Sequence, residues 1–335
     1  MIGGAYDLTA VFLLVALARL YSTIIRATQT LRIWPLTSGY EVCVSLIAIN
    51  QTRPVFFPLS RSLHVLEVVG GNIVSLEPLF ELCGLFQSID KLRIIQLVAS
   101  TGGLDLQSTI FSRPVKVRIG ALLYYNNSSQ ADWLARVFVK GLVAVMDDGG
   151  LTSMDVQLAP QRYKEHAAFN VLLSTRSLNL RTLGIRVDSV DLYNWTTDPA
   201  PFGAIDLGQC LRLREIQLSL RLFNGDLMTK GLEILLTLPP ESCLEKLAIH
   251  VTVADDTDEQ SLSAFFSHRV WGKLAEVLHS LSSFTCLTID FNSSPYDDGW
   301  SLPTDVKDLI RRRLVSPAVK LCIEIHRPAD HPVSG

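Results

Sequence analysis

A short hydrophobic pattern recurs along this chain and restricts its fold more than any other feature. In each copy, an apolar residue is followed by further apolar residues three and five positions later, and often seven. The better copies begin at Leu63, Leu92, Leu151, Leu180, Leu213, Leu244, Phe284 and Ala318, and a weaker copy begins at Ser112. These offsets place apolar side chains on one face of a short strand that follows a corner of the chain. The pattern therefore predicts a series of short strands with one apolar face.

Helix-like segments separate the expected strands. They span residues 75–86, 131–146, 226–238, 263–281 and 303–314. The strand copies recur at a mean spacing of about 32 residues, which is typical of a repeat architecture. Strands that alternate with helices return in the same direction, so the sequence predicts an α/β fold with a parallel sheet.

Two architectures satisfy this alternation, namely an open solenoid and a closed β/α barrel. The strands of a barrel are buried on both faces and read as continuous apolar runs. Here the positions between the apolar ones are largely polar, for example Glu67, Asp155 and Asp290. We therefore expect a leucine-rich-repeat-like solenoid, an open horseshoe of parallel strands with outer helices. A β/α-barrel enzyme is the alternative.

Several repeat units also resemble a known family. The segments LREIQLSLRL, CLEKLAIHVTV and FTCLTIDF, with TLPPESCLEKLAI before one strand, are similar to the divergent leucine-rich repeats of fungal F-box-like proteins. The resemblance covers roughly residues 60 to 327, and the F-box segment itself is not found in MIGGAYDLTAVFLL. It implies a role in substrate recognition or scaffolding, with a ubiquitin-ligase adaptor as one partner.

Residues at the same offset from the first apolar residue of each copy are expected to lie side by side on successive strands. This alignment predicts a charged strip on the concave face. Adjacent parallel strands lie about 4.8 Å apart, so the residues at offset six become neighbours. The candidate partner-binding residues are Arg118, Arg186, Glu215, Lys246, His250, Asp290 and Glu324. Lys116, Arg118 and Arg186 are expected to form a basic stretch further toward the amino end. We expect this strip to bind a protein partner. An acid–base site at His250, Asp290 and Glu324 is the alternative.

Other chemistry is not indicated by the sequence. The seven histidines and six cysteines show no metal-ligand spacing, and no phosphate-binding glycine motif or nucleophile elbow occurs. We therefore predict a non-enzymatic protein without cofactors, whose cysteines are small apolar residues. A formal net charge of −3 argues against general nucleic-acid binding.

The amino-terminal region contains an apolar run at residues 8–18 that Arg19 interrupts before it resumes. A membrane span needs about 20 apolar residues, so we expect a helix within a cap or degenerate repeat at residues 1–60. The solenoid is expected at 61–327 and a flexible tail at 328–335. These features favour the cytoplasm or nucleus. A membrane-anchored or secreted protein is the alternative, through residues 8–25 and sequons that include Asn126, Asn194 and Asn292.

Overall fold

The protein is described by a computed structural model that divides into two compact units, residues 1–154 and 155–335. The described residues are 30–33, 63–70, 72–73, 76, 79–80, 83–84, 86–99, 116–126, 131–158, 163–187, 205–222, 229, 231–253, 259–292, 304–314 and 319–326. The apolar run at residues 8–25 and the tail at 328–335 lie outside them. Within these ranges, no helix combines the length and the apolar composition that a bilayer crossing requires.

The first unit contains a parallel sheet in which the strand order follows the chain. Its strands are β1 (Thr30–Ile33), β2 (Leu63–Val69), β4 (Ser88–Ile95) and β6 (Arg118–Tyr125), and a separate parallel pair joins β3 (Asn72–Ile73) to β5 (Val98–Ala99). Residues 30–33 therefore add a strand from the region where we expected a cap or a degenerate repeat. The strand register differs from the predicted one, because Leu63 pairs with Ile89 rather than with Leu92.

Helix α5 (Ala131–Val145) follows β6 and supplies much of the core of the first unit. It agrees closely with the helix expected at residues 131–146. Its Phe138 ring stacks on Tyr124 of β6 at 5.2 Å and on Phe80 at 5.9 Å between centroids. All three rings are buried. Gly141 faces the Phe80 ring so closely that an added Cβ would overlap it.

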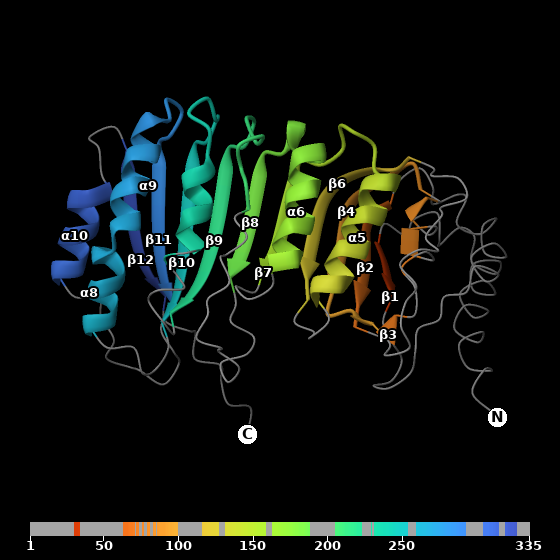
Figure 1. Ribbon diagram of the computed structural model, residues 1–335, viewed down its shortest axis with the longest axis horizontal. Helices are drawn as coiled ribbons and strands as arrows, with labels where there is room; N and C mark the ends of the chain where they lie inside the picture. Colours follow the sequence, from red (N-terminus) through yellow and green to blue (C-terminus); the bar gives the residue numbers. More distant parts are fainter. Residues whose placement is uncertain are drawn as a thin grey trace, which may run out of the picture. The chain divides into compact units, whose positions relative to one another are not determined.

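The second unit is a regular alternation of parallel strands and helices (Figure 1). The strands β8 (Thr182–Val187), β9 (Glu215–Leu222), β10 (Lys246–Val253), β11 (Cys286–Asn292) and β12 (Lys320–His326) pair in chain order, and β7 (Ser153–Leu158) spans the unit boundary. The helical elements are α6 (Tyr163–Arg176), η2 (Ser177–Asn179), η3 (Ile234–Thr237), α8 (Glu259–Ser267), α9 (Arg269–Ser280) and α10 (Thr304–Leu314). Figure 1 shows these helices on the same side of the strands.

The predicted α/β class with an unclosed parallel sheet is confirmed. In neither unit does the strand order return on itself, so the alternative of a closed β/α barrel is wrong. In the second unit the predicted register is correct. The residues at offset three, Leu183, Ile216, Leu247, Leu287 and Leu321, are direct partners across five strands.

One predicted helix of the second unit is divided in two. We expected a continuous helix at residues 263–281, but α8 ends at Ser267 and α9 begins at Arg269. His268 between them has extended backbone angles, and its ring accepts a hydrogen bond from the Val270 N–H at 3.3 Å. A side chain that accepts from the second helical residue acts as an N-cap, which explains why a new helix begins there.

Two helical glycines, Gly141 in α5 and Gly272 in α9, provide a matched test of how closely these helices are packed. Gly141→Ala is expected to lower the free energy of unfolding by about 1–3 kcal/mol, because the new methyl group overlaps the buried Phe80 ring. Gly272→Ala in α9 gains the same helix propensity, and its Cβ meets nothing within 4 Å. It is expected to raise the stability by about 0.5–1 kcal/mol. Urea denaturation followed by circular dichroism measures both, and equal effects of the same sign would contradict the described packing.

Candidate functional site

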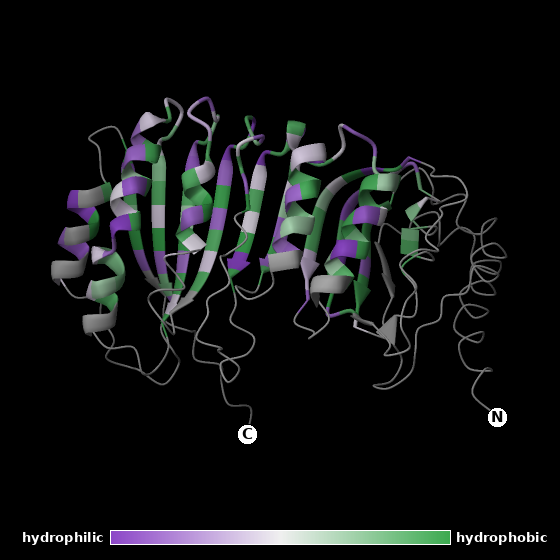
Figure 2. Cartoon of the chain, viewed as in Figure 1, coloured by the Kyte–Doolittle hydropathy of each residue, from purple (hydrophilic) through white to green (hydrophobic). Residues whose placement is uncertain are grey.

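The strands of the second unit separate apolar from polar side chains. Figure 2 shows hydrophobic and hydrophilic residues alternating along them. The apolar set is buried beneath the helices, and Phe291 of β11 lies 5.9 Å from Phe266 of α8 between ring centroids. Successive side chains of a strand point to opposite faces, so the residues between the apolar ones lie on the face opposite the helices. We call this surface of β8 to β12 the polar face.

Five residues of the polar face form one line across the strands, which we call the charged row. Its members are Arg186, Ser219, His250, Asp290 and Glu324, each a direct register partner of the next. The sequence-based prediction that His250, Asp290 and Glu324 are neighbours is therefore confirmed. Arg186 occupies the other end of the same row, and Ser219 separates it from His250.

The centre of the charged row is a histidine–carboxylate pair. His250 Nδ1 lies 2.9 Å from Asp290 Oδ2, which is the geometry of an imidazole N–H that donates to a carboxylate. The Asp290 side chain is only 9 % exposed, whereas that of His250 is 32 % exposed. The second carboxylate oxygen, Asp290 Oδ1, is buried and has no hydrogen-bond partner among the described residues. Because a buried carboxylate is costly without a partner, His250 compensates part of the burial of Asp290 and is held in a fixed orientation in return.

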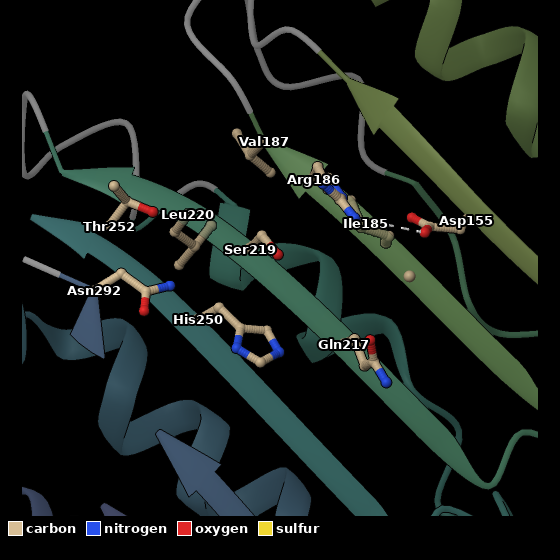
Figure 3. Close-up of a pocket in the computed structure, with 11 residues that line it drawn as sticks. Asp155, Ile185, Arg186, Val187, Gln217, Ser219, Leu220, His250, Thr252 and Asn292 are labelled. Atoms are coloured by element: carbon tan, nitrogen blue, oxygen red, sulfur yellow. Dashed lines mark ion pairs between the residues drawn. The ribbon is translucent and has the colours of Figure 1, made fainter. Parts of the chain in front are cut away.

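A pocket of about 470 Å³ lies over three members of the charged row, Arg186, Ser219 and His250 (Figure 3). The side chains that line it are Arg186, Gln217, Ser219, His250, Thr252 and Asn292 of the polar face, together with Asp155 of β7. Figure 3 shows Arg186, Ser219 and His250 on three neighbouring strands. Arg186 Nη2 lies 4.0 Å from Asp155 Oδ2, and its side chain remains 55 % exposed. The pocket therefore presents a cation, an imidazole, hydroxyls and amides within one concavity.

A second row of charges crosses the same face nearer the amino ends of the strands. Glu215 pairs with Lys246, which pairs with Cys286, and Cys286 pairs with Lys320. The predicted proximity of Glu215 and Lys246 is therefore confirmed. Gln217 Nε2 also donates to Glu215 Oε1 at 2.9 Å, which links this row to a residue that lines the pocket.

The predicted basic stretch of Lys116 and Arg118 is wrong in register. Arg118 is the first residue of β6 and pairs with Ser88, so it is not at the offset of the charged row. Lys116 precedes the strand, and its Nζ donates to the backbone oxygens of Ala144 and Met146 at 3.1 and 3.3 Å. The Lys116 side chain thus donates to backbone carbonyls at the carboxyl end of α5 that have no partner within the helix, which is a structural role.

The first unit contains a charged pair that the predicted register did not reveal. Glu67 of β2 and Arg93 of β4 are register partners, and Arg93 Nη1 lies 2.8 Å from Glu67 Oε1. The Glu67 side chain is only 5 % exposed. Offset counting from Leu92 placed Gln96 opposite Glu67 instead. In β4 (Ser88–Ile95), the apolar residues Leu92 and Ile94 follow Ile89 at offsets three and five. A repeat counted from Ile89 instead of Leu92 would have placed Arg93 opposite Glu67.

The described residues include five of the six cysteines, namely Cys83, Cys210, Cys243, Cys286 and Cys322. Among all the described residues, no group of three or more His, Cys, Asp or Glu side chains is placed to hold a metal ion. Burial raises the pKa of the Cys83 thiol to about 12 and that of Cys210 to about 11. Both behave as the apolar residues that the sequence predicted, whereas Cys243 is exposed. Asn126, one of the candidate glycosylation sites, is buried.

No protein-family model matches the chain, and no curated protein matches it either.

The His250–Asp290 pair can be tested with a double-mutant cycle. His250→Ala is expected to lower the free energy of unfolding by about 1–3 kcal/mol, because it leaves a buried carboxylate without its donor. The same substitution should cost less in an Asp290→Asn background, since a neutral amide is less costly to bury. The exposed pair Arg214–Glu245, 3.5 Å apart, is the control, and its coupling should stay below about 0.5 kcal/mol. Equal coupling energies in both pairs would contradict the prediction that the burial of Asp290 strengthens its contact with His250.

Thiol reactivity tests the described burial of the cysteines. At pH 8, iodoacetamide should modify exposed Cys243 first, because the raised pKa values of Cys83 and Cys210 leave almost no thiolate. Peptide mass spectrometry after a time course measures the order, and labelling in urea provides the control in which all thiols react. Cys83 labelled as fast as Cys243 in the folded protein would contradict this prediction.

Proposed function

We propose that this chain is a non-enzymatic protein-recognition scaffold and that it binds its partner on the polar face of β8 to β12. The observation that carries this proposal is the charged row, which continues in register across five strands. A surface of mixed charge on a sheet suits an extended or convex protein partner, because complementary charges steer the encounter and fix the register of binding.

A leucine-rich-repeat-like solenoid remains our proposal for the architecture. It is supported by parallel strands that follow chain order, by helices on one side of the second unit, and by the resemblance of its repeat segments. The same resemblance supports the narrower role of an F-box-type substrate-recognition subunit that lacks its own F-box. Residence in the cytoplasm or nucleus stays a prediction.

The arrangement of side chains and backbone N–H groups on the polar face favours binding over catalysis. The order Asp290, His250, Ser219 across three strands places a hydroxyl beside a carboxylate-bound imidazole. However, among the contacts of the described residues, no hydrogen bond joins Ser219 to His250. The backbone N–H groups of these strands are used in the parallel ladder, so they cannot form an oxyanion hole on this face. Recognition by side chains needs neither feature.

Charge reversal at the two ends of the charged row tests this function. Arg186→Glu and Glu324→Lys change exposed side chains on the polar face, whereas Lys273→Glu and Glu276→Lys make matched changes on the exposed side of α9. Proteins captured from native extract by the wild-type chain should be lost about tenfold with either face variant, a change equivalent to about 1.4 kcal/mol. The α9 variants should retain them.

Quantitative mass spectrometry of cross-linked captures provides the measurement. It also shows whether a ubiquitin-ligase adaptor is among the captured proteins, which the F-box-type role requires. If capture is the same for all four variants, the polar face is not the binding surface and the proposal fails.

A further inference from the structure

The charged row has an electrostatic polarity. Its β8 end carries Arg186, and its β11–β12 end carries Asp290 and Glu324. Ser219 and His250 lie between the two ends. A ligand that crosses the strands along this row therefore meets a cation first and carboxylates last. This polarity specifies more about the occupant than the mixed charge of the whole face does.

The distance between the two ends defines the length of the matching ligand. Arg186 and Glu324 are separated by four strand spacings, or roughly 19 Å at about 4.8 Å for each spacing. An extended peptide rises about 3.3 Å per residue, so two of its residues that are about six positions apart span the row.

The β8 end suits a carboxylate. The pocket there combines the Arg186 guanidinium with the Gln217 amide and the Ser219 hydroxyl, all of which can donate hydrogen bonds. The guanidinium matches the geometry of a carboxylate with two parallel donors. Asp155 Oδ2 lies 4.0 Å from Arg186 Nη2, so an incoming carboxylate competes with the Asp155 carboxylate for the guanidinium.

The β11–β12 end suits a cation. Glu324 is exposed, and the neighbouring Asp290 is more than nine-tenths buried. Within the described part of the chain, Asp290 Oδ1 has no hydrogen-bond partner. His250 donates to the other oxygen, Oδ2, and so leaves the negative charge of Asp290 only partly compensated. An ammonium or guanidinium group above Glu324 gains from both carboxylates, since their negative charges act at neighbouring positions.

From these observations we infer that the charged row recognises an extended peptide segment of the partner that carries Asp or Glu over β8 and Lys or Arg about six residues away over β11–β12. This inference rests on the proposed function and adds the chemical identity of the bound segment. Alternate side chains of an extended segment point the same way, so an even separation places both charges toward the sheet. A separation of five turns one charge away from the sheet.

A synthetic peptide array tests this inference directly. The probes are Gly/Ser peptides with one Glu and one Lys at separations of two to seven residues, in both orders, together with Glu–Glu and Lys–Lys versions. The wild-type chain should retain the Glu–Lys probes with a separation of about six most strongly, by about fivefold over the separation of five and over the like-charge probes. Equal retention of all probes would overturn the inference.

Variants at the two ends should change the preference rather than abolish binding. Arg186→Glu reverses the charge of the β8 end and should therefore favour the Lys–Lys probe. Glu324→Lys neutralises the β11–β12 end, because Asp290 stays beside the new lysine, so the Glu–Glu probe should be retained as well as the Glu–Lys probe. The controls are Lys273→Glu and Glu276→Lys on α9, which should keep the wild-type preference. A uniform loss of binding in both end variants, without a new preference, would also overturn the inference.

Asp155→Asn provides a test in the opposite direction. It removes the carboxylate that competes for Arg186, so retention of the Glu–Lys probe should increase by about two- to fivefold. Because this is a gain, it cannot result from unfolding. An unchanged or reduced signal would contradict the role of Arg186 as the site of the carboxylate.

The outcomes separate this inference from the proposed function. If capture of proteins depends on Arg186 and Glu324 but the array shows no preference, the surface binds proteins and the peptide inference fails. If capture is independent of both residues, the proposed function itself fails. Retention that is uniform across the array, together with dimerisation in sedimentation velocity that Arg186→Glu abolishes, would assign the face to a second copy of the chain and overturn the inference.

Discussion

The in-register pairing of apolar residues across the parallel strands is the constraint on which the rest of the second unit depends. Leu183, Ile216 and Leu247 are partners on successive strands, and each is buried. A shift of one residue in any strand would move its apolar residues to the polar face, so burial fixes the register strongly. Because the register is fixed, the residues between the apolar ones also align. The alignment of the charged row is therefore a consequence of the core. Which side chains occupy the row does not depend on the core residues.

That independence has one exception, at Asp290. Most members of the polar face are exposed or half-buried, and their charges cost little. Asp290 is buried, and none of the residues that the structure describes forms a hydrogen bond with its Oδ1. Burial of a carboxylate lowers the free energy of unfolding unless a donor compensates for it, and the contact with His250 does so in part. Asp290 is therefore more costly to stability than the exposed members of the polar face.

The sequence predicted the second unit better than the first for a physical reason. From Leu180 onward, each strand has apolar residues at offsets three, five and seven, so only one alignment buries them all. In the first unit the run from Ile89 to Leu97 offers several apolar starts, and counting from Leu92 shifted the register by three residues. Helix α6 was missed because buried Glu165 and His166 interrupt its apolar pattern. The burial of Asp290 and the position of the pocket depend on three-dimensional packing, which offsets alone do not encode.

Parallel strands and single side chains together explain how such a surface acquires specificity. The ladder uses the backbone groups of the inner strands, so a partner cannot add its own backbone to the middle of the sheet, and recognition depends on side chains. Each strand contributes one residue to the charged row, and each contribution comes from a different repeat. A substitution at one offset thus changes one position of the row and leaves the buried partners of that strand untouched. Since stability in a repeat architecture is largely a sum over neighbouring units, the binding row can vary while the fold stays the same.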